Sequence, residues 1–138
     1  MQEPLRILMV EDMPADAELA QREISREIPQ CAFRRVETKD DFLREMEEFR
    51  PDIVISDYSM PRFDGMTALR LSIARDPMVP VILLTGSMNE DTAVACMKAG
   101  ATDYVIKEHA KRLGSAILGA MEKKSLWAEA ARRERERT

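Results

Sequence analysis

Five short apolar runs recur along the chain at the length of β-strands. The runs are Ile7–Val10, Phe33–Val36, Ile53–Ile55, Val81–Leu84 and Tyr104–Ile106. The first, third and fourth are continuously apolar and rich in Ile, Val and Leu, which is typical of parallel strands covered on both faces. The second run holds Arg34 and Arg35. It therefore fits a strand at the edge of the sheet.

The stretches between these runs have helical spacing and helix-end signals. Pro14 suits a first helical turn, Thr38 is a good N-cap, and Gly100 is a good stop after a helix. The expected helices begin at Pro14, after Thr38, at Gly65, at about Glu90 and near His109. Strands and helices that alternate in this way predict an α/β fold, a doubly wound parallel sheet of five strands with helices on both faces.

Polar residues end four of the runs, and ligand sites in open parallel sheets lie outside the carboxyl ends of the strands. In chain order these residues are Glu11, Asp12, Asp57, Thr85 and Lys107. We expect them on one rim, because the carboxyl ends of parallel strands share one edge of the sheet. Glu37 ends the second run and, as part of an edge strand, is expected away from the centre of that rim.

Three carboxylates at adjacent strand ends would repel and raise each other's pKa unless a cation lay among them. Oxygen ligands favour Mg²⁺, which also binds phosphate oxygens. A phosphoryl group on a carboxylate would then be met by the metal, the Lys107 ammonium and the Thr85 hydroxyl. Taken singly, Asp12 could be a helix cap and Asp57 an Asx-turn residue. Their joint occurrence at four strand ends favours a site.

Longer motifs surround these residues. They are Val10-Glu11-Asp12, Ser56-Asp57-Tyr58-Ser59-Met60-Pro61 with Gly65, Leu84-Thr85-Gly86, and the segment Lys98–Lys107. As a set, over about Arg6–Met121, they resemble the receiver domain of two-component response regulators, the family that includes the chemotaxis receiver. The resemblance implies a flavodoxin-like strand order, 2-1-3-4-5.

The resemblance also implies a metal and a phosphoacceptor. Asp57 would accept the phosphoryl group. Asp12 and Asp57 would bind Mg²⁺ together with the backbone carbonyl of Ser59, and Glu11 would act through a metal-bound water.

By the same resemblance, Thr85 and Lys107 would hold the phosphoryl oxygens. Tyr104 takes the position of the aromatic switch residue, whose ring in this family turns inward when the threonine is drawn towards the phosphate. The added charge would bias a two-state arrangement near Tyr104 and so change partner or dimer contacts.

The implied reaction is in-line attack by Asp57 on a phosphohistidine, followed by hydrolysis of the aspartyl phosphate. The partner would be a sensor histidine kinase or a phosphotransfer protein in a phosphorelay. The domain would not be an enzyme in the usual sense, but a phosphoacceptor that assists its own phosphorylation and dephosphorylation.

Three alternatives fit less well. An aspartate-nucleophile phosphatase needs a second Asp two residues after the first, where this chain has Ser59. A nucleotide-binding domain needs a glycine cradle, which the turn after Val10 lacks. A receiver-like interaction module that never takes phosphate is opposed by the complete rim, and Mg²⁺-dependent beryllofluoride binding would separate the two.

Two positions depart from the family pattern. The family has Pro after the lysine, joined by a cis peptide, whereas Glu108 follows Lys107 here. Because a non-proline cis bond costs about 3–4 kcal/mol, we expect a trans bond or a reshaped loop. Gly86 after Thr85 leaves the phosphoryl site open on one side, which favours access by water or a phosphatase.

Composition narrows the class of protein. The chain has 138 residues and a net charge of -4, which argues against direct nucleic-acid binding, because that binding depends on clustered Lys and Arg. No apolar stretch approaches the roughly 20 residues that cross a bilayer, and the first residues lack the layout of a secretion signal. Cys31 and Cys96 stand alone and are expected to be reduced. We therefore expect a cytoplasmic protein without a membrane partner.

The last residues differ from the rest in charge. Residues 123–138 carry six Lys and Arg against three Glu, a net +3, while the preceding 122 residues carry -7. We expect a receiver domain over 1–122 and a charged helical extension of the last helix over 123–138. A solvated helix and a connector or dimerising coil both stay open, because a sustained heptad is missing. Trp127 favours contact with a second copy or an output domain.

Overall fold

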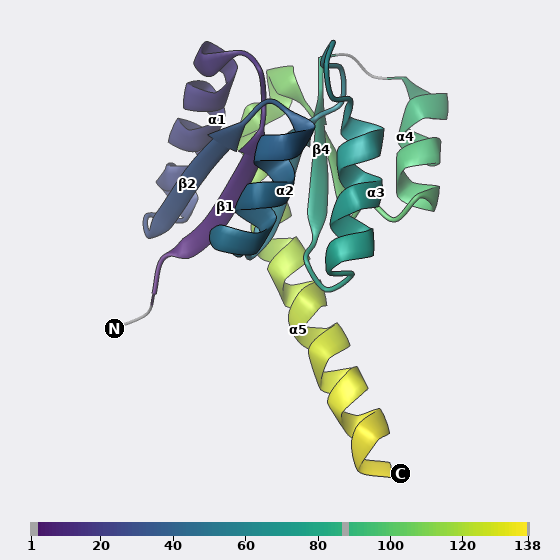
Figure 1. Ribbon diagram of the computed structural model, residues 1–138. Coiled ribbons are helices and arrows are strands. Elements are labelled where there is room, and N and C mark those ends of the chain that lie inside the picture. Colours follow the sequence, from purple (N-terminus) through teal and green to yellow (C-terminus); the bar gives the residue numbers. More distant parts are fainter. Residues whose placement is uncertain (1–2, 87–88, 138) are drawn as a thin grey trace.

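A single parallel sheet organises the described residues, 3–86 and 89–137, of the computed structural model. Within them, five strands lie in the order β2-β1-β3-β4-β5, as expected (Figure 1). The strands are β1 Leu5–Val10, β2 Cys31–Val36, β3 Ile53–Asp57, β4 Val81–Thr85 and β5 Asp103–Ile106. All four neighbouring pairs are parallel. The strands extend one or two residues beyond the apolar runs, because backbone pairing continues into polar positions such as Asp57 and Thr85.

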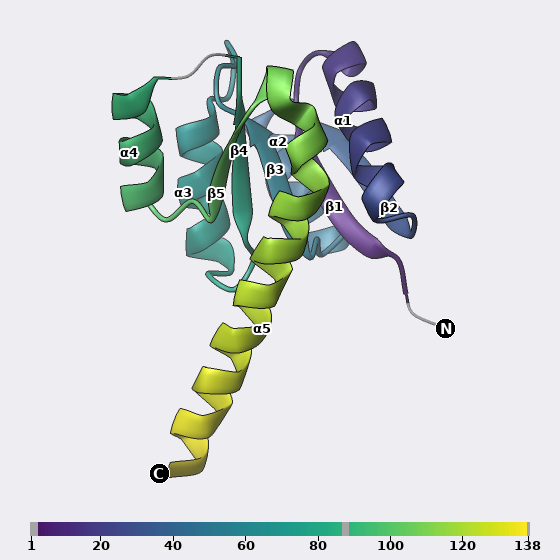
Figure 2. The same ribbon diagram turned by 180° about the vertical axis from the view of Figure 1, so that it is seen from behind.

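Helices cover both faces of the sheet. They are α1 Pro14–Glu27, α2 Lys39–Glu48, α3 Gly65–Arg75, α4 Glu90–Lys98, the 3-10 helix η1 Lys107–Arg112, and α5 Leu113–Arg137. The side chains of α2, α3 and α4 join one buried cluster with the alternate strand residues Leu8, Val54 and Leu83. Those of α1 and α5 join a second cluster on the other face, with Ile7, Ile55 and Ile82 (Figure 2). The core is therefore two apolar layers divided by the sheet.

Helix ends follow local chemistry at several points. Thr38 caps α2, because its side chain accepts a hydrogen bond from the backbone N–H of Asp41 at 3.2 Å. Gly100 ends α4 with a φ of 111°, a value that favours glycine. Met13 occupies the N-cap position of α1, so Asp12 lies one residue before the position from which a side chain caps this helix. The interpretation of Asp12 as a helix cap is therefore wrong.

The segment after Lys107 differs from the expected start of a helix near His109. A 3-10 helix comes first, and its backbone at His109 is non-helical, with φ -109° and ψ 36°. The α-helix begins only at Leu113, whose side chain is fully buried in the second cluster. None of the described peptide bonds is cis, so Lys107 and Glu108 are joined by a trans bond, as expected.

The helix α5 continues far beyond the sheet. Its first half buries Leu113, Ile117 and Ala120 against the second cluster, and Met121 packs at the margin. From there the helix projects away from the domain as one unbroken element (Figures 1 and 2). Trp127, on this projecting part, is 43% exposed. Within the described residues, no helix has the length and apolar character that would span a bilayer.

Candidate functional site

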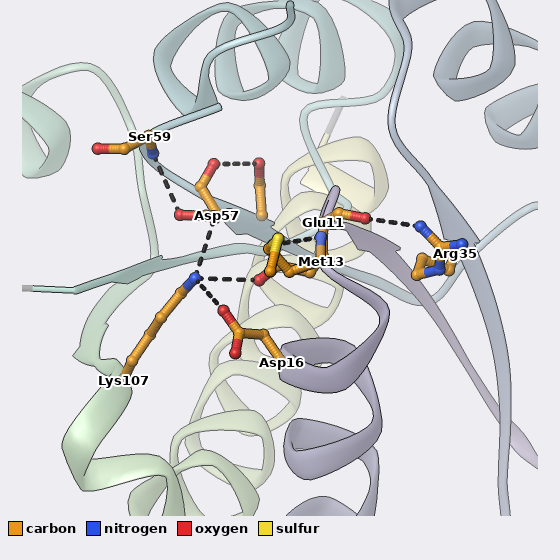
Figure 3. A network of polar contacts seen from close by, with 8 residues as sticks. Glu11, Met13, Asp16, Arg35, Asp57, Ser59 and Lys107 are labelled. Carbon is orange, nitrogen blue, oxygen red and sulfur yellow. Dashed lines mark hydrogen bonds and ion pairs between the residues drawn. The ribbon is translucent and has the colours of Figure 1, made fainter. Parts of the chain in front are cut away.

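Asp57 stands at the carboxyl end of the central strand β3 and is only 5% exposed. Its Oδ1 accepts a hydrogen bond from the backbone N–H of Ser59 at 3.1 Å. Its Oδ2 accepts one from Nζ of Lys107 at 3.0 Å. Figure 3 shows the side chain held between these two partners. A buried carboxylate with two hydrogen bonds has a defined orientation at the edge of the sheet.

Gly65 keeps the loop after Asp57 tightly folded. Its N–H donates to the carbonyl of Tyr58 at 3.0 Å. A Cβ at this position would lie 2.7 Å from both the Asp57 carbonyl oxygen and the Tyr58 Cα. Glycine is required here because the first turn of α3 rests on the backbone that carries Asp57.

Glu11 and Asp12 follow β1, next to β3 in the sheet. The Glu11 backbone is held by two neighbours: its N–H donates to the Val36 carbonyl at 3.0 Å, and its carbonyl accepts from Arg35 at 3.0 Å. One ligand oxygen each from Glu11, Asp12 and Asp57 lies within 4.8 Å of the others. The structure therefore brings the three predicted carboxylates together.

The environment of Glu11 suits a cation. Burial, together with the charge of nearby Asp57, raises the pKa of Glu11 to about 7, although the Met13 N–H and Lys107 favour its ionised form. Its Oε1 lies 3.2 Å from Nζ of Lys107 but is buried without a well-aligned hydrogen bond among the described residues. An oxygen-only set of carboxylates with an unsatisfied oxygen fits a hard divalent ion such as Mg²⁺.

Lys107, directly after β5, contacts three carboxylates at once. Its Nζ lies 3.2 Å from Glu11, 2.9 Å from Asp16 and 3.0 Å from Asp57 (Figure 3). Burial alone would lower the pKa of Lys107, but the hydrogen bonds to Asp16 and Asp57 and the carboxylate charges outweigh it and raise the pKa. The lysine is therefore a fixed positive charge in the site.

Asp16 is a residue that sequence reasoning missed. It lies in the first turn of α1, where acidic residues are common because they complement the helix dipole. Nothing in a linear pattern links it to a lysine 91 positions later. The one available signal was its place in the first turn of α1, which follows directly on the strand end that carries Glu11 and Asp12.

Thr85 and Tyr104 lie beside this cluster. Thr85 ends β4, is buried, and pairs with Ile106 in the sheet, one residue before Lys107. A Cβ on the following Gly86 would meet no atom of the described residues within 4 Å. Tyr104 is half-buried and packs against the core cluster on the side of α3 and α4.

Glu37 lies closer to the site than expected. Together with Asp12, Met60, Pro61 and Arg62 it lines a cavity of about 280 Å³ at the carboxyl edge. The reason is the strand order: β2 is an edge strand, but it pairs directly with β1, so its end stands next to Asp12. An edge position in this sheet is only one strand away from the acidic residues.

The fold and this site define a doubly wound α/β domain with an acidic pocket and one lysine at the carboxyl edge of the sheet. The family model of the response regulator receiver domain matches residues 7–118. The chain belongs to that family, and it is a receiver domain of the kind used in two-component systems.

Individual relatives agree with this assignment. The chain is 33% identical over 101 residues, 73% of its length, to the DNA-binding transcriptional regulator NtrC of Proteus hauseri, of which it covers 21%. It is 30% identical over 113 residues, 80% of its length, to a protein-glutamate methylesterase/protein-glutamine glutaminase of Nitrobacter hamburgensis, of which it covers 30%. The chain thus spans less than a third of these relatives.

A solved structure covers nearly the whole fold. It is the signal receiver domain of the putative Luxo repressor protein from Vibrio parahaemolyticus, with a TM-score of 0.80 and 27% identity. The match covers 94% of this chain and 98% of that one. Receiver domains accept a phosphoryl group on an aspartate and bind Mg²⁺ at an acidic pocket, and in this chain Glu11, Asp12 and Asp57 form an acidic cluster.

Proposed function

We propose that Asp57 is the phosphoacceptor of this domain. One observation carries the assignment: Asp57 is the buried carboxylate at the central strand end that lies both among the acidic residues and 3.0 Å from Lys107. Attack by its carboxylate oxygen on a phosphohistidine forms an O–P bond, breaks the N–P bond and returns the electron pair to the histidine nitrogen. Water later breaks the O–P bond and releases inorganic phosphate.

The residues around Asp57 bind the metal ion that balances the negative charge of the phosphoryl group. In this proposal Asp12, Asp57 and the backbone carbonyl of Ser59 hold Mg²⁺, and Glu11 acts through a metal-bound water. The ion neutralises phosphoryl charge when bound. The buried, unsatisfied Oε1 of Glu11 and the 4.8 Å cluster support this set.

Thr85 and Lys107 complete the phosphoryl site. Lys107 already places its ammonium against Asp57, and Thr85 ends the strand between β3 and β5. Both lie where oxygens of a phosphoryl group on Asp57 would need donors. When Thr85 moves towards these oxygens it leaves room on its other side, and Tyr104, half-buried on the neighbouring strand, is the ring that responds.

The partners follow from this chemistry. The phosphodonor is a sensor histidine kinase or a phosphotransfer protein, and the domain acts as a phosphoacceptor rather than as an independent enzyme. Such a kinase forms its phosphohistidine from cytoplasmic ATP, so we place the domain in the cytoplasm. The projecting part of α5, with Trp127 43% exposed, is the surface for a second copy or an adjoining output domain.

The experiment is phosphorylation by a small phosphodonor with Mg²⁺, read by intact mass. We expect one added phosphoryl group on the wild-type chain and none on Asp57→Ala. The matched control is Asp40→Asn, an exposed carboxylate in the first turn of α2, which should be phosphorylated like wild type. Equal phosphorylation of Asp57→Ala would overturn the assignment.

A further inference from the structure

Asp16 forms a contact with Lys107 that the proposed reaction does not use. Its Oδ2 accepts a hydrogen bond from Nζ of Lys107 at 2.9 Å, the shortest of the three carboxylate contacts of that nitrogen. The pair joins the first turn of α1 to the start of η1. Figure 3 shows the Asp16 side chain approaching the lysine from the opposite side to Asp57.

Lys107 divides its positive charge among three carboxylates. Two of the three N–H groups of its ammonium donate to Asp16 and Asp57. Glu11 Oε1 lies 3.2 Å from the same nitrogen as an ion-pair partner, without a well-aligned hydrogen bond among the described residues. A phosphoryl group on Asp57 therefore competes with Glu11 and Asp16 for the ammonium.

Burial decides which carboxylate leaves. Asp57 itself carries the phosphoryl group, so the choice lies between Glu11, whose side chain is 3% exposed, and Asp16, whose side chain is 42% exposed. A carboxylate that loses its partner inside the protein remains poorly solvated, while one at the surface regains water. Asp16 is the partner that is released at the lowest cost.

We infer that Asp16 is a positioning residue that competes with the phosphoryl oxygens for Lys107 and so weakens the phosphorylated state. This inference rests on the proposed function. Before phosphorylation Asp16 holds the ammonium over the rim. On phosphorylation the ammonium turns to the phosphoryl oxygens and Asp16 turns to solvent. The strength of the pair then sets how readily the domain takes and keeps a phosphoryl group.

The first test is the affinity for beryllofluoride, a phosphoryl analogue, with saturating Mg²⁺, measured by calorimetry on the full chain. Because a partly exposed ion pair contributes little, we expect Asp16→Asn to bind about two- to fivefold more tightly than wild type. The control is Glu18→Gln, which removes one negative charge from the same helix at a side chain that is 75% exposed. It should bind like wild type. Unchanged or weaker binding by Asp16→Asn overturns the inference, and so does an equal gain in Glu18→Gln.

A second test separates competition for the lysine from a general charge effect. If Asp16 acts through Lys107, the gain from Asp16→Asn disappears when both proteins also carry Lys107→Met. A gain that persists contradicts the inference. The ¹³C signal of the Asp16 carboxyl in wild type gives a readout independent of affinity: it should shift when beryllofluoride saturates the site, and a fixed signal contradicts release. Absence of beryllofluoride binding in wild type would instead mean that the proposed function itself is wrong.

Discussion

The two ends of the molecule hold charged side chains in opposite ways. At the carboxyl edge of the sheet, Glu11 and Asp57 are buried, and each lies within 3.2 Å of Nζ of the half-buried Lys107. On the projecting part of α5, the ion pair of Arg133 with Glu129 connects two exposed side chains one turn apart. The first arrangement depends on four strands meeting at one rim, and the second needs only a helix. Substitutions at the carboxyl edge should therefore affect the whole domain, and substitutions on the projecting part of α5 should have only local effects.

The largest expected difference concerns apolar side chains on the two halves of α5. Ile117 is fully buried against the sheet, and Leu126 is 59% exposed on the projecting part. Ile117→Ala should lower the free energy of unfolding by about 2–5 kcal/mol, because it removes buried surface and leaves a cavity. Leu126→Ala should change it by less than about 0.5 kcal/mol. Urea unfolding followed by circular dichroism measures both, and similar losses would mean that the projecting part packs against the domain.

Two glycines give the next comparison. Gly65→Ala places a Cβ 2.7 Å from backbone atoms of Asp57 and Tyr58. We expect it to lower the free energy of unfolding by about 1–3 kcal/mol and to slow phosphorylation, because the phosphoacceptor backbone must move. Gly119 on α5 has nothing within 4 Å of an added Cβ, so Gly119→Ala should stabilise the protein by up to about 1 kcal/mol through helix propensity. The same unfolding assay checks both. An unchanged free energy of unfolding in Gly65→Ala would show that the loop after Asp57 can shift at little cost.

The raised pKa of Glu11 predicts that the affinity of the acidic edge for Mg²⁺ depends on pH. Since this pKa is about 7 against the ordinary 4.5, a proton competes with the cation below pH 7. The apparent affinity for Mg²⁺, measured by calorimetry, should rise about tenfold from pH 6 to pH 8, as expected for one competing proton.

Protein stability should respond in the opposite direction when Mg²⁺ is absent. Between pH 4.5 and about 7 the folded state binds more protons at Glu11 than the unfolded state does. The stabilisation from this group is complete below pH 4.5 and is lost as the pH rises through 7. Glu11→Gln should flatten both profiles in this range. An unchanged Mg²⁺ profile in Glu11→Gln would place the titrating group elsewhere.

The smallest effect on the fold is expected from removing the projecting part. A chain that ends after Lys123 should keep its free energy of unfolding within about 0.5 kcal/mol and should still be phosphorylated. If the projecting part contacts a second copy, sedimentation of the intact chain should show a dimer that the shortened chain lacks. A monomer in both cases would contradict contact with a second copy.

Much of the fold could be predicted from local patterns. The continuous apolar runs became buried strands, and Thr38 and Gly100 mark helix ends as expected. The rim could also be predicted, because parallel strands must end at a common edge. These features depend on the spacing of apolar residues, on residues that cap helices and on the common direction of the strands. Residues close together in the sequence are enough to indicate each of them. The start of the last helix was harder, since the burial of Leu113 in the second cluster and the non-helical His109 decide where it begins.

Strand-end positions in the sequence are sufficient to predict which residues lie on the rim: Glu11, Asp12 and Asp57 with Thr85 and Lys107. Three further properties come from the folded arrangement: the contact of Asp16 with Lys107, the raised pKa of Glu11, and the place of Glu37 beside Asp12. The physical reason is that strand order and burial set distances and solvation between residues far apart in the chain. A pattern along the chain contains neither these distances nor this solvation.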